Sequence, residues 1–214
     1  MESLNKDNYA PLKAELPKAI GIQNFFLKGV RNSVVEMLQR FGAHNVLDVC
    51  SGGGALAHML RERGMTVQAV DASPTMADYS RSRYGIITKV MEAEKLPFHE
   101  QFDAAIIGMT LHELGDQQRE EVWSHIEEAV KTTGIVIAVD YTAPPAGFIN
   151  RLVQNMVTLD EATFDAVSPG HYPDYKKFMA EGGLVNWLQK HKGYFHEERT
   201  HMFGNIAVVA VMKQ

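Results

Sequence analysis

The chain has 214 residues, 45% of them hydrophobic, and a net charge of −5 from 21 basic and 26 acidic side chains. These values are ordinary for a globular protein, and the length suits one domain with a sizeable core, so 1–214 is expected to be a single domain. The negative balance gives no general reason to expect a nucleic-acid partner. The single cysteine, Cys50, cannot form an internal disulfide, which suits a reducing cytoplasm.

The first residues lack a basic stretch followed by an apolar core, so they do not resemble a secretory signal. No apolar run reaches the roughly 20 residues that cross a bilayer, and stable membrane insertion is not expected. Residues 1–16 are predicted to form a loose arm, followed by one long helix that opens at Pro17 and ends near Gly42. The arm and this helix are expected either to pack on a sheet or to cover a ligand as a lid. In the second case Tyr9 and Asn24 are the residues expected to contact the ligand.

A strand, a glycine-rich turn, a helix and a second strand are predicted between Asn45 and Asp71. An apolar run is followed at once by Ser51-Gly-Gly-Gly54, where no β-carbon keeps a ligand from the backbone amides. The second strand ends at Asp71, where a carboxylate can accept hydrogen bonds from both hydroxyls of a ribose. This stretch is therefore predicted to bind a nucleoside.

The following pattern alternates helices and strands with short connections. Such alternation predicts a doubly wound, Rossmann-like α/β sheet with helices on both faces. Two strands expected at 194–200 and 205–212 are too close for a helical crossover, so they must pair antiparallel, in a mostly parallel sheet of about seven strands. The elements expected between Asp71 and this strand pair are strands at 86–91, 102–109 and 134–141, helices at 74–83, 116–131, 148–159 and 175–190, and a turn-rich loop at 168–173.

Four stretches in this order resemble the motifs of class I S-adenosylmethionine-dependent methyltransferases. They are VLDVCSGGG at 46–54, VDASPTM at 70–76, EAEKLPF at 92–98 with Phe102-Asp103, and GMTLH at 108–112. More narrowly, the chain resembles the branch that includes the ubiquinone and menaquinone C-methyltransferases (methyltransferase type 11). The specific resemblance covers about residues 40–141. Cys50 replaces the first family glycine, and Gly53 stands where many relatives have threonine.

The resemblance implies S-adenosylmethionine as the cofactor, S-adenosylhomocysteine as the product, and a small-molecule acceptor that is methylated on carbon or oxygen. It implies that Asp48 orients the ammonium group of the cofactor, that Asp71 binds the ribose, and that Glu92 and the Ala93 amide hold the adenine. The full set of expected cofactor-binding residues is Asp48, Cys50, Ser51, Gly52, Gly53, Gly54, Asp71, Ala72, Met76, Glu92, Ala93 and Gly108.

Methyl transfer depends mainly on positioning, and a base is needed only where the acceptor must lose a proton. The candidate catalytic residues follow strands at their carboxyl ends or lie in the later loop: His171, Tyr172, His112 and Tyr141, with Asp140 beside them. Residues 142–192 are expected to form a helical insertion that caps an apolar or aromatic substrate. Its expected apolar chamber is lined by Phe148, Leu152, Met156, Phe164, Tyr172, Phe178 and Trp187.

No metal site is expected, although the chain has nine histidines. His112-Glu113 lacks a second histidine at the spacing of zinc proteases, and His191 with His196 has no clear third partner. The pattern leaves two alternative functions open, which are a cofactor-binding module without catalysis and an NAD(P)-dependent oxidoreductase. It also leaves a homodimer open. The oxidoreductase fits Gly52-Gly-Gly-Ala-Leu-Ala57 and the Tyr-x-x-x-Lys spacing of Tyr172 and Lys176, but Pro173 argues against a helix there except at its very start.

Overall fold

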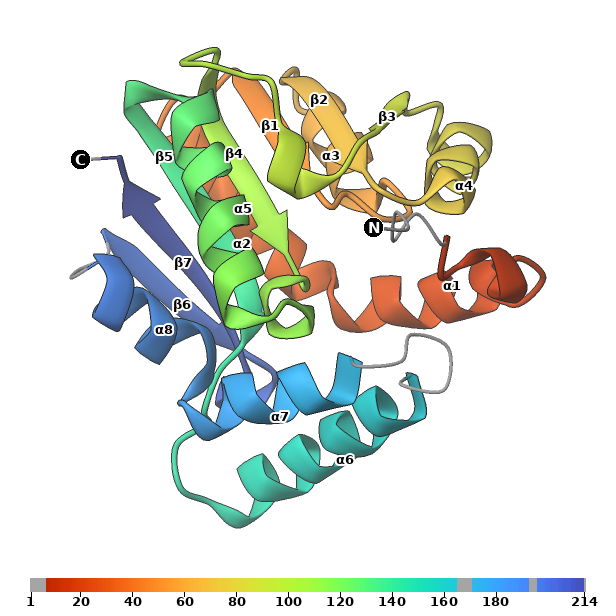
Figure 1. Cartoon of the computed structure of the whole chain (residues 1–214), viewed down its shortest axis with the longest axis vertical. Coiled ribbons are helices and arrows are strands. Elements are labelled where there is room, and N and C mark those ends of the chain that lie inside the picture. Colours follow the sequence, from red (N-terminus) through yellow and green to blue (C-terminus); the bar gives the residue numbers. More distant parts are fainter. Residues whose placement is uncertain (1–6, 165–170, 193–195, 214) are drawn as a thin grey trace.

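A computed structural model describes residues 7–164, 171–192 and 196–213 (Figure 1). Its centre is a seven-stranded sheet with the strand order β3-β2-β1-β4-β5-β7-β6. Only β7 runs antiparallel to its two neighbours, β5 and β6. The strands are β1 (Asn45–Val49), β2 (Thr66–Asp71), β3 (Thr88–Val90), β4 (Phe102–Gly108), β5 (Val130–Tyr141), β6 (Glu197–His201) and β7 (Ile206–Met212). The predicted fold class, with its C-terminal antiparallel pair, is confirmed.

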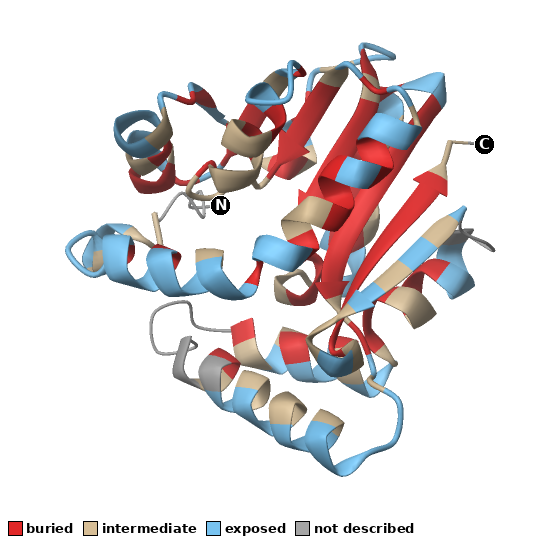
Figure 2. Ribbon diagram, turned by 180° about the vertical axis from the view of Figure 1, so that it is seen from behind, coloured by how far each residue is buried: buried red, intermediate tan, exposed pale blue. Residues whose placement is uncertain are grey.

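Helices cover both faces of the sheet, and the strands between them are buried along most of their length (Figure 2). Helices α5, α7 and α8 pack on one face, whereas α2 and α3 pack on the other. Successive strand residues alternate between these two cores, as the pleat requires. The helices are α1 (Leu16–Phe26), α2 (Lys28–Arg40), α3 (Ala55–Arg61), α4 (Pro74–Tyr84), α5 (Asp116–Ala129), α6 (Phe148–Phe164), α7 (His171–Ala180) and α8 (Gly183–Lys192).

The prediction of a single N-terminal helix is wrong, because the helix is interrupted at Leu27, between α1 and α2. Leu27 has φ −87° and ψ 3°, outside the helical region, and its side chain is buried. The break lets α2 pack on the sheet while α1 extends beyond it toward the N-terminal arm (Figure 1). The apolar side chains of the two helices therefore belong to two separate hydrophobic clusters. Ile20 of α1 packs with Met76, and Val34 of α2 packs with the sheet.

The predicted boundaries after residue 142 also need correction. Helix α7 begins at His171, inside the segment expected to be a loop, and Pro173 lies in its first turn, where proline costs no hydrogen bond. The expected helix at 175–190 is two helices, because Gly182, between them, and Gly183, the first residue of α8, adopt φ values of +98° and +70°. The loop prediction at 168–170 and the side chain of Phe164 lie outside what the structure describes.

The described side chains that were predicted to line an apolar chamber in residues 142–192 do not surround a cavity. The side chains of Phe178 and Trp187 are buried, but they pack into the core of the sheet rather than around a cavity. On α6, Phe148, Leu152 and Met156 are exposed, with Phe148 at 85%, so they do not line a chamber. Among the described residues, no helix combines the length and hydrophobicity needed to span a membrane.

Candidate active site

The turn after β1 is built on left-handed backbone. Gly52 and Gly54 have φ values of +52° and +78°, and Cys50 has +55°. A left-handed conformation is inexpensive only for glycine, which explains why the related motif has glycine where this chain has Cys50. Gly54 has a second constraint, because a β-carbon there would overlap Ser80 Oγ and come within 2.9 Å of Ser80 Cβ. The turn therefore lies close against α4.

Asp71 fastens this turn to the end of β2. Its Oδ2 accepts a hydrogen bond from the Gly52 amide (2.7 Å), and its Oδ1 accepts one from the Ser73 amide (2.9 Å). Burial raises the pKa of Asp71, and the two amide hydrogen bonds oppose that rise. Ser73 caps α4, since its hydroxyl accepts a hydrogen bond from the Met76 amide (3.0 Å). Each carboxylate oxygen keeps a further lone pair for a ligand hydroxyl.

A cavity of about 700 Å³ opens at the carboxyl ends of β1, β2 and β4, beside this turn. Doubly wound sheets bind their ligands at this edge, where the strand order reverses between β1 and β4. Every residue predicted to bind the cofactor lines the cavity, with the exception of Gly54. Tyr9 and Asn24, the predicted contacts of the N-terminal segment, line it as well.

Asp48 and Arg31 place opposite charges at one end of the cavity. Asp48 is buried, and its Oδ2 has no hydrogen-bond partner within the described residues. Burial and the charge of Asp71 raise the pKa of Asp48 to about 7, although the guanidinium of Arg31 acts in the opposite direction. Burial also lowers the pKa of Arg31. A buried acceptor without a partner is costly, so this end of the cavity is suited to a ligand with a cationic donor.

The N-terminal arm covers the cavity from the side of α4. The carboxylate of Asp7 accepts hydrogen bonds from the Ser73 hydroxyl (2.6 Å) and the Thr75 amide (3.0 Å). These contacts hold the arm on the first turn of α4, so that Tyr9 becomes part of the cavity wall. Burial raises the pKa of Tyr9, and the charge of Glu113 raises it further. The described part of the arm therefore forms part of the cavity wall.

His112 lies in the short helical turn η3 (Leu111–Glu113) after β4 and is held by Asp140 at the end of β5. Asp140 Oδ1 and His112 Nδ1 are 2.6 Å apart, and Asp140 Oδ2 accepts a hydrogen bond from the His112 amide (3.2 Å). Burial alone would lower the pKa of His112, but the charge and hydrogen bond of Asp140, with the charges of Glu113 and Glu161, raise it to about 9. Arg119 fixes the turn by donating to the carbonyls of Leu111 (2.8 Å) and Leu114 (2.6 Å).

Glu161 of α6 joins three of the predicted catalytic residues into one buried cluster. Its Oε1 accepts a hydrogen bond from the Tyr141 hydroxyl (2.7 Å), and its Oε2 contacts His171 Nε2 and lies 3.7 Å from His112 Nε2. Burial opposes ionisation, but the His171 hydrogen bond and the His112 charge keep the pKa of Glu161 below its ordinary value. The structure thus brings His112, Tyr141 and His171 together, next to Glu113 of the cavity wall.

Tyr172 does not join this cluster. It lies on α7 with its ring stacked on that of Tyr175 at 6.2 Å, and Lys176 Nζ lies 4.6 Å from its ring centroid. Tyr172 and Lys176 therefore share a helix, as the oxidoreductase alternative requires. Neither residue lines the cavity, however, so the pair lies away from the glycine-rich turn.

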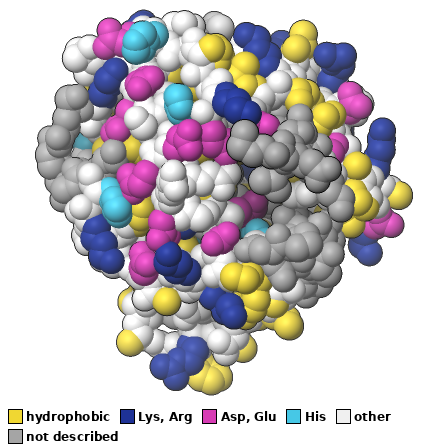
Figure 3. Space-filling model, in the orientation of Figure 1, with side chains coloured by type: hydrophobic (Ala, Val, Ile, Leu, Met, Phe, Trp, Pro, Cys, Tyr) yellow, Lys and Arg dark blue, Asp and Glu magenta, His cyan; other side chains and the backbone are white. Residues whose placement is uncertain are grey.

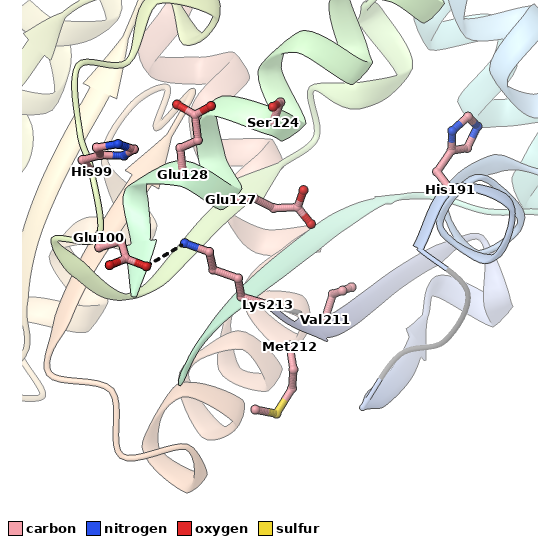
Figure 4. A pocket seen from close by; sticks show the side chains of 9 residues that line it. All are labelled: His99, Glu100, Ser124, Glu127, Glu128, His191, Val211, Met212 and Lys213. Atoms are coloured by element: carbon pink, nitrogen blue, oxygen red, sulfur yellow. Dashed lines mark hydrogen bonds and ion pairs between the residues drawn. The ribbon is translucent and has the colours of Figure 1, made fainter. Parts of the chain in front are cut away.

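A second pocket, of about 720 Å³, lies at the opposite edge of the sheet, near the start of β4 and the end of β7 (Figure 4). Glu100, Glu127 and Glu128 contribute to its wall, and the Lys213 ammonium forms an ion pair with Glu100 at 3.4 Å. This is the amino-terminal edge of the parallel strands, where the fold does not place its ligands. Figure 3 shows acidic and basic side chains interspersed on the face that it presents.

The sequence is similar to those of known methyltransferases over the part of the chain that contains the glycine-rich turn. Residues 46–134 match the sequence model of a family described as "Methyltransferase domain". An uncharacterized methyltransferase of Synechocystis sp. is 36% identical over 112 residues, which are 51% of this chain and 53% of that protein. The chain thus spans about half the length of the curated relative that it matches.

Solved structures share the fold at low identity. The PH0226 protein from Pyrococcus horikoshii superposes with a TM-score of 0.62 at 14% identity, over 91% of each chain. A magnesium protoporphyrin IX methyltransferase from Synechocystis, solved with bound S-adenosylhomocysteine, gives 0.59 at 16% identity, over 89% of this chain and 84% of that one. Residues 46–134 therefore match a methyltransferase domain, and the chain shares its fold with solved proteins that include a methyltransferase. The narrower resemblance to quinone C-methyltransferases stays a prediction.

The sequence analysis does not single out Arg31 or Glu161. Nothing in the spacing of Arg31 indicates that α2 turns it toward Asp48. Glu161 was not singled out because its partners lie on other elements, and only the fold brings α6 against η3 and α7. The available signal was that each of these two charged residues lies on a helix face that is otherwise apolar.

Proposed function

We propose that this protein transfers a methyl group from S-adenosylmethionine to a small-molecule acceptor. The observation that carries the proposal is the cavity at the carboxyl edge of the sheet, because it is lined by all but Gly54 of the residues that the methyltransferase motifs assign to the cofactor. The oxidoreductase alternative is not favoured, since Tyr172 and Lys176 lie away from this cavity.

The charges in the cavity fit the amino-acid end of the cofactor. That end carries an ammonium and a carboxylate, and the cavity offers the carboxylate of Asp48 and the guanidinium of Arg31. Asp48 Oδ2, which lacks a partner among the described residues, would gain a charged donor. Asp71 would bind the ribose hydroxyls, and Glu92 with the Ala93 amide would bind the adenine.

The acceptor would bind between the glycine-rich turn and the His112 cluster. A sulfonium supplies an electrophilic methyl group, so the task of the protein is to position the acceptor and to exclude water. Glu113 and Tyr9 line this side of the cavity. We propose an apolar or aromatic acceptor that is methylated on carbon or oxygen, since Leu114, Val122 and Val139 form apolar parts of the wall.

The direct test is ligand binding followed by product identification. The purified protein is expected to bind S-adenosylhomocysteine in isothermal titration calorimetry and to show no heat with NAD or NADP. Metabolite extracts incubated with methyl-labelled cofactor should then yield a labelled product. Binding of S-adenosylhomocysteine without any labelled product in a broad set of extracts would favour a binding module, and binding of NAD alone would overturn the proposal.

Replacing Asp71 with alanine should weaken S-adenosylhomocysteine binding by about 1–3 kcal/mol, because the ribose hydroxyls lose their acceptor. Calorimetry on Asp71→Ala checks this result. Asp78, on the exposed side of α4, provides the control, and Asp78→Ala should bind like the wild type. Equal affinities of the two variants would remove Asp71 from the ribose site.

A further inference from the structure

His112, Glu161 and His171 come from three separate elements and converge in the interior. The ligand atoms that they offer, two imidazole nitrogens and a carboxylate oxygen, all lie within 4.8 Å of one another. His112 and His171 are 2% and 4% exposed, and Glu161 is 8% exposed. Within the described ranges, no other group of three histidine, cysteine or acidic residues brings its ligand atoms so close. We propose that this trio binds a divalent transition-metal ion.

The donor set is one that such ions use. Two histidines and one carboxylate bind zinc in catalytic sites and iron(II) in facial triads, and both arrangements leave coordination positions open. The two histidines approach the same carboxylate oxygen, because the Nε2 atoms of His112 and His171 both face Oε2 of Glu161. Nearby acids add to the preference for a cation, since Asp140 and Glu113 lie at 2.6 Å and 3.8 Å from the nitrogens of His112.

The surrounding contacts orient the proposed ligands as in known metal sites. Histidines that bind metals commonly use their second ring nitrogen to contact a carboxylate, which fixes the tautomer and the direction of the free nitrogen. Asp140 does this for His112 at Nδ1, and Asp140 is itself held by the amides of His112 and Tyr141. The Tyr141 hydroxyl occupies Oε1 of Glu161, so Oε2 is the oxygen presented to the two histidines.

The location gives the ion a role in the proposed methyl transfer, and this part of the inference rests on that function. Glu113 lines the cofactor cavity and its Oε1 lies 3.8 Å from His112 Nε2, so the trio adjoins the acceptor side of the cavity. An ion with open positions would bind an anionic oxygen of the acceptor and hold it in place. The acceptor class would then be one with a metal-binding oxygen, such as a phenolate or an enolate.

The test is metal binding by the full chain, measured without turnover. The protein is stripped with a chelator and titrated with zinc chloride by calorimetry and with cobalt chloride by visible absorption. One equivalent should bind, with the cobalt absorption of an ion bound to nitrogen. His171→Ala and Glu161→Gln each remove one ligand, and both should weaken zinc binding by more than about 100-fold, beyond the 10–100-fold typical of outer contacts.

His191 provides the matched control, because its Nδ1 lies 2.7 Å from Glu120 Oε1, outside the trio. His191→Ala should bind zinc like the wild type. No stoichiometric binding by the wild type would overturn the inference without depending on any variant, and so would unchanged affinity in His171→Ala. S-adenosylhomocysteine titrations of the same samples show that each variant is folded. Cofactor binding without metal binding defeats this inference alone, whereas metal binding without cofactor binding defeats the proposed function.

Discussion

Replacing Gly54 with alanine is expected to destabilise the protein by roughly 3 kcal/mol, the largest stability loss that we predict for a single added methyl group. Two costs add at this position. The left-handed backbone, with φ +78°, strains any residue that carries a β-carbon. The new atom would also overlap Ser80, which is fully buried and hydrogen-bonded to Thr88 at 3.3 Å, so it has little room to move. Urea unfolding of Gly54→Ala measures the loss.

Gly64 separates the two costs. It has nearly the same backbone conformation, with φ +81°, but a β-carbon there would meet no atom within 4 Å. Gly64→Ala should therefore show only the strain, about 1 kcal/mol. If Gly54→Ala costs no more than Gly64→Ala, the contact between the glycine turn and α4 is not as tight as described.

Replacing Asp48 with asparagine should stabilise the cofactor-free protein in a pH-dependent way. The folded protein holds the pKa of Asp48 at about 7, above the ordinary value of 3.8, so the group binds a proton more strongly in the folded state. Its contribution to stability is therefore fully present below pH 4 and is lost as the pH rises through 7. Since one pKa unit corresponds to 1.36 kcal/mol, the loss is on the order of 4 kcal/mol.

The stability difference between Asp48→Asn and the wild type should thus grow in favour of the variant from pH 4 to pH 7 and then level off. Asp103 provides the contrast, because the Lys131 hydrogen bond and the amides of Asn45 and His44 outweigh burial and lower its pKa to about 2. Asp103→Asn should lose stability above pH 4 and approach the wild type as the pH falls toward 2. Chemical unfolding over this range measures both. A flat difference for Asp48→Asn would contradict the buried charge.

The same substitution should weaken S-adenosylhomocysteine binding, because the ammonium group would lose its carboxylate. The wild-type affinity should rise as the pH increases through about 7, since a protonated Asp48 cannot form that ion pair. Asp48→Asn should bind more weakly and lose this pH dependence, as calorimetry at several pH values would show. Stabilisation together with weaker binding is the combination expected of a residue kept for its function.

The sequence predicts those parts of this molecule that depend on local pattern. From Asn45 to Tyr84, each strand is followed closely by its turn and helix, so hydrophobic spacing and glycine positions suffice to place the glycine-rich turn and Asp71 at one edge of the sheet. The break at Leu27 is different, because leucine has no tendency to end a helix, and only the separate packing of α1 and α2 explains it. The start of α7 at His171 was hidden by a proline that is favourable in a first helical turn.

The acidic and histidine cluster could be predicted only in part. His112, Tyr141 and His171 were selected one by one, because each follows a strand or lies in the later segment at the expected edge of the sheet. Their meeting at Glu161 depends on how α6 and α7 pack against the turn after β4, which no short spacing encodes. Pairs of neighbouring histidines were therefore a poor guide to where a metal could bind.

The two outermost strands limit how copies of this protein can associate. Open sheet edges recruit other strands unless they are short or charged. Here β3 has three residues, and β6 reads Glu-Glu-Arg-Thr-His, with Glu197 and Arg199 engaged by Arg40 and Glu36 of α2. Neither edge favours addition of a further strand. A homodimer, which the sequence leaves open, would therefore gain little from these edges, whereas the exposed apolar side chains of α6 offer a surface for it.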